Sequence, residues 1–123
     1  MPSPVAPPGW PRGVRPPGAP GWEESAVAWL LDQCPADYRA HEVLRRHPEV
    51  LARFAAHHVD ASLEGARAAY AGARRELHDR VDPEVLDAAL RALEAEGARL
   101  ARAAREVALV EGALRGTRWR PRL

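Results

Sequence analysis

Histidine has the widest catalytic and metal-binding chemistry of any residue type in this sequence, and the chain contains five of them. Asp37 and His41 stand four residues apart, so a helix would place both on one face and offer two metal ligands. No third ligand stands near that pair. His57 and His58 are neighbours that a helix would direct about 100° apart, so they would not share a metal. We therefore expect neither a metal site nor a cofactor.

The sequence also lacks the motifs of nucleophilic and phosphate-transfer chemistry. His41 and Glu42 begin the zinc-protease pattern H-E-x-x-H, but Arg45 stands where the second histidine belongs. No G-x-S-x-G occurs, and without lysine no ordinary phosphate-binding loop can be built. Cys34 falls late in a predicted helix, where the helix dipole disfavours a thiolate, so we expect an inert thiol. These observations predict a protein that is not an enzyme.

Length and composition favour one small helical domain. The chain has 123 residues, 46% of them hydrophobic but only 6% aromatic, so any core must be thin. No apolar run is long enough to span a membrane. Proline and glycine interrupt the N-terminal segment, which therefore does not resemble a secretory signal. We expect a cytoplasmic protein without contact to membranes.

Charge is distributed unevenly along the sequence. Lysine, isoleucine and asparagine are absent, which is typical of a GC-rich genome, so richness in arginine is weak evidence for nucleic-acid binding. All 17 acidic residues lie between Glu23 and Glu111. Residues 23–114 therefore carry a net charge of −5, whereas the two ends together carry +6. The near-neutral total conceals an acidic body with basic ends.

Periodic apolar residues and helix-start signals predict an all-α fold. Pro48 can occupy the first turn of one long helix, and Asp82 followed by Pro83 can begin a second. Gly116 can supply the left-handed residue that ends it. The single helical domain is expected to span residues 22–115, with helices at about 23–34, 36–46, 49–80 and 83–115.

The two long helices carry apolar residues at alternating spacings of three and four, the repeat that turns one face toward a partner helix. The short connection near Pro83 predicts that the chain turns back on itself as an antiparallel hairpin, with the shorter helices packed at its open end. Paired residue numbers should then sum to about 163. The expected pairs include Tyr70 with Leu93, Leu63 with Leu100 and Leu77 with Leu86, and only Ala52 opposite Glu111 breaks the pattern.

Most arginines in the body have an acidic residue at helical spacing, which is typical of a solvated helix face. No basic stripe for a nucleic-acid duplex appears among them. The pairs are Glu49–Arg53, Glu64–Arg67, Glu76–Arg80, Asp87–Arg91, Glu96–Arg99, Arg102–Glu106 and Glu111–Arg115.

A hairpin of this length would leave apolar residues uncovered far from the open end. Tyr70 and Leu77 belong to this distal half, together with Ala69, Val81 and Ala89. A second copy of the chain, giving a four-helix bundle, is the simplest cover, and a different protein is the other. Tyr70 and Leu77 are therefore candidate partner-binding residues, and a homo-oligomer is expected.

Residues 1–21 form an arm dominated by proline and glycine, which should be extended or turned rather than helical. Trp10 and Trp22 are its candidate contact residues. Their rings either anchor the arm to the protein's own helices or present it to a proline-recognising groove on another protein. A disordered arm is the third interpretation.

The last residues, 116–123, form a basic tail without acids. Such a tail can dock on the protein's own acidic body, on an acidic surface of another protein, or on nucleic acid through phosphate contacts and stacking. Its candidate residues, together with the last helical arginine, are Arg115, Arg118, Trp119, Arg120 and Arg122.

These patterns predict a non-catalytic helical interaction or scaffold protein that binds protein through its hairpin, either itself or another chain. The alternative is a small nucleic-acid or ribonucleoprotein accessory factor that contacts phosphate through the basic tail. A third hypothesis is a regulator that senses pH through the histidines of residues 41–58.

Overall fold

The computed structural model describes residues 4–116 of the chain and is helical throughout, with no strand in that part. The prediction of an all-α protein is therefore confirmed. The elements, in chain order, are α1 (Trp22–Asp32), the 3₁₀ helix η1 (Ala36–Ala40), α2 (Glu42–Arg46), α3 (Pro48–Leu77) and α4 (Pro83–Leu114).

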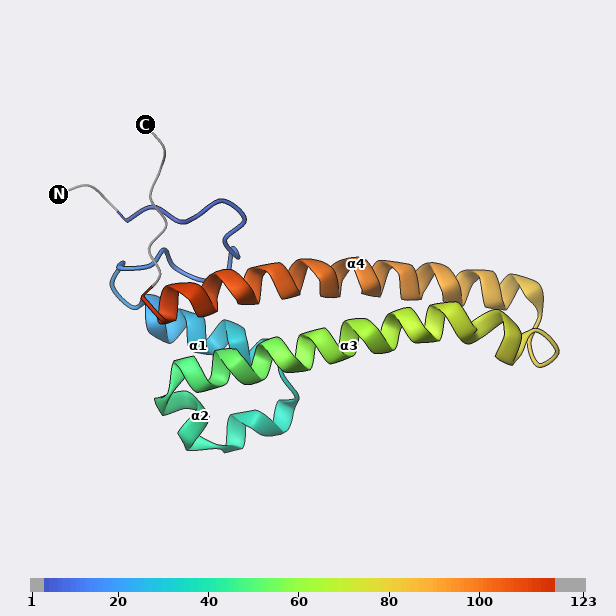
Figure 1. The fold of residues 1–123 in the computed structure, drawn as a ribbon, viewed down its shortest axis with the longest axis horizontal. Coiled ribbons are helices and arrows are strands. Elements are labelled where there is room, and N and C mark those ends of the chain that lie inside the picture. The colour runs from blue at the N-terminus through green and yellow to red at the C-terminus, as the bar shows by residue number, and fades with distance from the viewer. Residues whose placement is uncertain (1–3, 117–123) are drawn as a thin grey trace.

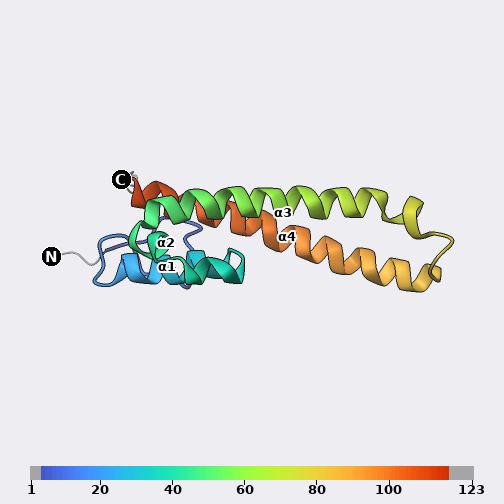
Figure 2. The ribbon, with the colours of Figure 1, turned by 90° about the horizontal axis from the view of Figure 1, so that it is seen from below.

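The two long helices, α3 and α4, pack against each other (Figure 1). They contain 30 and 32 residues, so each is about 45 Å long at 1.5 Å per residue. In Figure 1, α4 lies above α3 along its whole length, and the turned view in Figure 2 shows the two helices crossing at a shallow angle. No helix among residues 4–116 is both long enough and apolar enough to cross a membrane.

The shorter elements pack only at the end of the long helices that lies away from their connection, as both views show. There α1 contacts both α3 and α4, and α2 contacts α3. The core forms where these elements meet. Its largest side chains with almost no exposed surface come from α1, α3 and α4, and they are Leu30, Leu51, Val59, Val107 and Val110.

Proline begins both long helices, as predicted. Pro48 and Pro83 each lie in the first turn, where the missing backbone N–H costs no helical hydrogen bond. Asp82 occupies the N-cap position of α4 with an extended ψ of 145°, but its side chain makes no capping hydrogen bond. At the other end Gly116 has a φ of +88°, the left-handed conformation predicted for it.

The predicted end of the first long helix at Arg80 is wrong by three residues. The helix ends at Leu77, whose carbonyl oxygen accepts hydrogen bonds from the backbone N–H groups of Arg80 and Val81. This tight turn reverses the chain early. It leaves room for Asp82 to be extended, as the residue before a proline prefers.

The single short helix predicted over residues 36–46 is also wrong, because His41 interrupts it with an extended backbone (φ −99°, ψ 102°). Only Leu44 in this segment is buried. With so little packing to favour continuous α-helical geometry, the segment divides into η1 and α2 and uses tight hydrogen bonds across the break.

Ion pairs between α3 and α4 show how the two helices are aligned. Arg53 Nε lies 3.3 Å from Glu111 Oε2, and Arg74 Nη2 lies 3.2 Å from Asp87 Oδ1. Each acid lies within two residues of the position that the predicted register places opposite its arginine. The pairing of individual apolar side chains stays a prediction.

Candidate interaction surface

The far end of the molecule, away from α1 and α2, exposes large apolar side chains. Tyr70 and Leu77 on α3 are 46% and 40% exposed, Val81 in the connection is 36% exposed, and Val85 at the start of α4 is 55% exposed. We call these four residues the distal apolar surface. It contains the two residues of α3 that the sequence nominated for partner binding.

This surface exists because only two helices are present at that level. Leu86 and Leu90 of α4 are 4% and 5% exposed, so the contact with α3 buries one row of side chains well. A third element would be needed to cover the neighbouring rows, and α1 and α2 lie at the opposite end (Figures 1 and 2). The exposure of Tyr70 and Leu77 therefore follows from the architecture rather than from a local irregularity.

Small side chains extend the distal apolar surface along α4. Val85, Ala89 and Ala92 are exposed and fall at i, i+4 and i+7, which places them on one face of the helix. Ala69 on α3 is exposed as well. Alanine lets another helix approach closely, so this face can accept a helical partner without rearrangement.

Charges around the distal apolar surface are balanced in sign. Residues 64–99 contain eight acids and six arginines. The ion pair between Arg74 and Asp87 joins α3 to α4 across the seam, although its side chains are 66% and 51% exposed. A second copy of the chain would therefore meet both signs of charge and little net repulsion.

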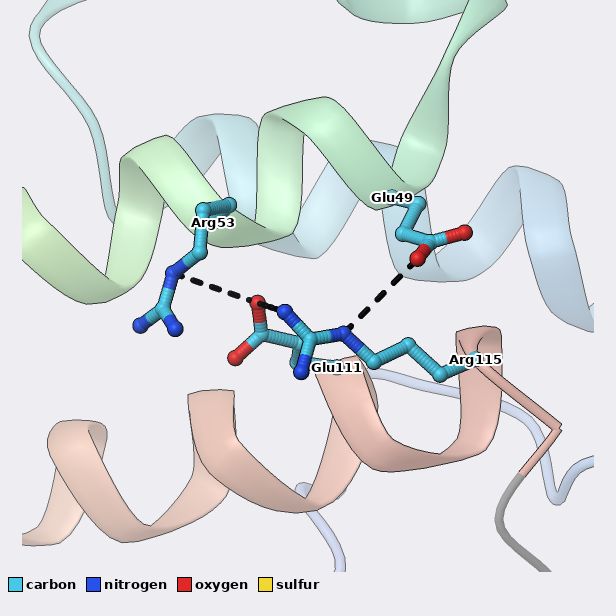
Figure 3. A network of polar contacts seen from close by, with 4 residues as sticks. All are labelled: Glu49, Arg53, Glu111 and Arg115. Carbon is cyan, nitrogen blue, oxygen red and sulfur yellow. Dashed lines mark hydrogen bonds and ion pairs between the residues drawn. The ribbon is translucent and has the colours of Figure 1, made fainter.

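At the opposite end a cluster of four charged residues links the two long helices (Figure 3). Glu111 on α4 is only 7% exposed, yet its carboxylate lies 3.3 Å from Arg53 Nε and accepts a 3.2 Å hydrogen bond from Arg115 Nη2. Arg115 Nε also lies 3.7 Å from Glu49 Oε1 on α3. Two arginines thus share one buried carboxylate, and Arg115, a predicted partner-binding residue, contacts the protein's own side chains.

This cluster corrects two expectations. Glu111 was the one residue expected to break the apolar pattern, but Arg53 and Arg115 neutralise it at that level. The pair expected along the helix between Glu49 and Arg53 is absent from the ion pairs of residues 4–116, because Arg53 turns to α4 instead. A carboxylate on the facing helix is the better partner here since it is buried and otherwise unpaired.

Both tryptophans of the predicted contact set lie on the protein's own core. Trp10 Nε1 donates a 2.9 Å hydrogen bond to the carbonyl oxygen of Val14, and its ring centroid lies 6.4 Å from that of Trp22. Both rings are partly buried against the core cluster. Their remaining surface faces shallow cavities rather than open solvent, as Trp22 lines a cavity of about 700 Å³ beside α4.

The remaining candidate residues of the basic tail, Arg118, Trp119, Arg120 and Arg122, lie outside the described residues. The hypothesis of nucleic-acid contact through this tail therefore stays a prediction.

The histidines and the cysteine lie apart from one another. Among residues 4–116 no three His, Cys, Asp or Glu side chains gather closely enough to hold a metal ion. His58 and Cys34 line one small cavity, and burial raises the pKa of the Cys34 thiol to about 11, opposed in part by the positive charge of Arg39. The thiol is therefore protonated at neutral pH.

Sequence reasoning missed a second exposed apolar patch, at the open end. Val43, Val50 and Phe54 are 58%, 42% and 46% exposed, and the ring of Phe54 meets that of Tyr38 edge-on at 6.5 Å. The spacing of Val50 and Phe54 at i and i+4 was the available signal. It was overlooked because these residues lie off the face that packs on α4.

Comparison of the chain with protein-family models, with curated proteins and with solved structures finds no match in any of the three.

Proposed function

We propose that this chain is a non-catalytic helical interaction protein that associates with a second copy of itself through the distal apolar surface. The observation that carries the proposal is the exposure of Tyr70, Leu77 and Val85 at 46%, 40% and 55% on one end of the molecule. Apolar side chains of this size, gathered together and rimmed by charge, are typical of a protein-binding surface.

A second copy is the simplest occupant because it supplies what the distal half lacks. In this proposal α3 and α4 form an antiparallel coiled-coil hairpin, with Tyr70 opposite Leu93 and Leu63 opposite Leu100. Two such hairpins laid face to face around a two-fold axis make a four-helix bundle, in which each copy covers the exposed row of the other. The balanced charges of residues 64–99 favour such a self-complementary contact.

The area available sets the expected strength. Each half-exposed residue of the surface gains about 1 kcal/mol when it is buried, so eight side chains in a symmetric dimer supply about 8 kcal/mol. Association costs at least about 4 kcal/mol in lost translational and rotational freedom. The dimer is therefore expected to dissociate at concentrations between about 1 μM and 1 mM.

Light scattering over a concentration series tests the proposal. We expect the mass to rise toward that of a dimer between about 1 μM and 1 mM. The double variant Tyr70→Ser, Leu77→Ser should remain a monomer throughout. The matched control Val43→Ser, Val50→Ser removes apolar surface that is equally exposed at the open end, and it should associate as the unmodified chain does. A monomer at every concentration, or equal loss in both variants, contradicts the proposal.

A further inference from the structure

A groove of about 1,100 Å³ lies between the N-terminal arm, α1 and α4. Its position is separate from the distal apolar surface, since the arm lies beside the C-terminal part of α4 (Figure 1). Two kinds of side chain with recognition chemistry line it. They are the aromatic residues Trp10 and Trp29 and the basic residues Arg12, Arg102 and Arg105.

The fold builds one wall of this groove from arm backbone that contacts the helices directly. Gly9 has a φ of +81°, and a Cβ placed there would lie 3.6 Å from Leu109 Cδ1 on α4. A Cβ at Gly13 would lie only 3.1 Å from the ring of Trp29 on α1, so the arm backbone fits closely against that ring. These contacts, with the hydrogen bond from Trp10 to Val14, hold the arm at the groove's edge.

The arginines of the groove are not neutralised by the described residues. Arg102 and Arg105 stand three residues apart on α4, and Arg12 comes from the arm. None of the three forms an ion pair or side-chain hydrogen bond within residues 4–116, although Glu106 lies in the same lining. The groove thus has an excess of two positive charges on a body whose net charge is −5.

Arginine and tryptophan together recognise a specific kind of ligand. The planar guanidinium group binds phosphate oxygens with paired hydrogen bonds, and an indole face stacks on a planar heterocycle. We propose that this groove binds a nucleotide, either free or within a single strand, with its phosphate on Arg102 and Arg105 and its base against Trp10 or Trp29. A volume near that of ordinary small-molecule sites, about 300–1,000 Å³, agrees with a ligand of this size.

Calorimetric titration of the full chain with adenosine monophosphate tests this assignment. We expect adenosine monophosphate to bind more tightly than inorganic phosphate or adenosine alone, because only it engages both parts of the groove. The variant Arg102→Gln, Arg105→Gln should weaken binding about tenfold or more, since each lost charge-assisted hydrogen bond matters in a partly enclosed site. The control Arg80→Gln, Arg91→Gln removes two exposed arginines outside the groove and should leave binding unchanged.

Further arms separate the sources of the ligand and the competing explanations. Tighter binding of a short oligoadenylate than of adenosine monophosphate assigns the groove to a strand, and equal binding assigns it to a free nucleotide. Absence of binding by both probes up to millimolar concentration overturns the proposal. So does binding that Arg118→Gln, Arg120→Gln, Arg122→Gln abolishes while the groove variant does not, or capture of a glutamate-rich peptide in place of either probe. Loss of self-association in the Tyr70 and Leu77 variant leaves this test unaffected.

Discussion

The two ends of the long helices differ in how many elements meet there. At the open end α1 lies against both α3 and α4, and Leu51 and Val107 have no exposed surface. At the distal end the same two helices pack only on each other, and Leu77 is 40% exposed. One helix pair thus forms a complete core at one end and half a core at the other. A third packed element decides whether an apolar residue contributes fully to stability.

Truncation of one leucine at each end should show the largest difference. Leu51→Ala removes a fully buried side chain, so we expect the free energy of unfolding to fall by about 3 kcal/mol. Leu77→Ala on the same helix should cost about 1 kcal/mol or less at low protein concentration, because much of the side chain is already in water. Urea denaturation at a few micromolar measures both changes.

Raising the concentration sharpens this comparison. If a second copy covers the distal surface, the cost of Leu77→Ala increases with protein concentration, whereas that of Leu51→Ala does not. Equal costs for the two truncations at low concentration would contradict the contrast between the ends.

Removal of charge should follow the same contrast with a smaller effect. Glu111→Ala leaves Arg53 and Arg115 without their shared buried carboxylate, so we expect a loss of about 2 kcal/mol. Asp87→Ala breaks the exposed ion pair with Arg74 and should cost less than about 0.5 kcal/mol. Thermal unfolding of the two variants compares them, and a larger loss for Asp87→Ala would show that burial does not set the strength of these pairs.

Cys34 should give the smallest effect on stability. Burial raises the pKa of its thiol from 9.0 to about 11, so the unfolded chain loses this proton at lower pH than the folded protein. The contribution is complete below pH 9 and is lost as the pH rises from 9 to 11. Since the thiol is only partly buried, the loss should stay below about 1 kcal/mol.

Denaturation at pH 8 and pH 10.5 measures this contribution of Cys34. The control Cys34→Ala should lose less stability between the two pH values than the unmodified chain does. An identical loss in both proteins would show that the thiol titrates as it does in the unfolded chain.

The sequence predicted best those features that depend on local chemistry. Pro48 and Pro83 mark where the long helices begin, because proline lacks the N–H that the first helical turn does not need. Gly116 marks a left-handed residue for a similar local reason. The exposure of Tyr70 and Leu77 was also foreseeable, since the first helices are too short to reach them.

Features that depend on contacts between distant segments were not predictable in the same way. Glu111 appeared as a mismatch because its two arginines come from different turns and different helices. The arginine and tryptophan groove was missed because Arg12 and Arg102 are brought together only when the arm folds onto α4. Helix spacing rules describe one helix at a time and contain no information on such meetings.

Hydrogen exchange at two protein concentrations tests the central claim most directly. Backbone amides of residues 63–77 and 83–97 should exchange more slowly at about 500 μM than at about 5 μM, because a second copy then covers the distal half. Amides of α1 and of residues 51–59 should exchange at the same rate in both samples. Distal amides whose exchange is independent of concentration would contradict a distal surface that a second copy covers.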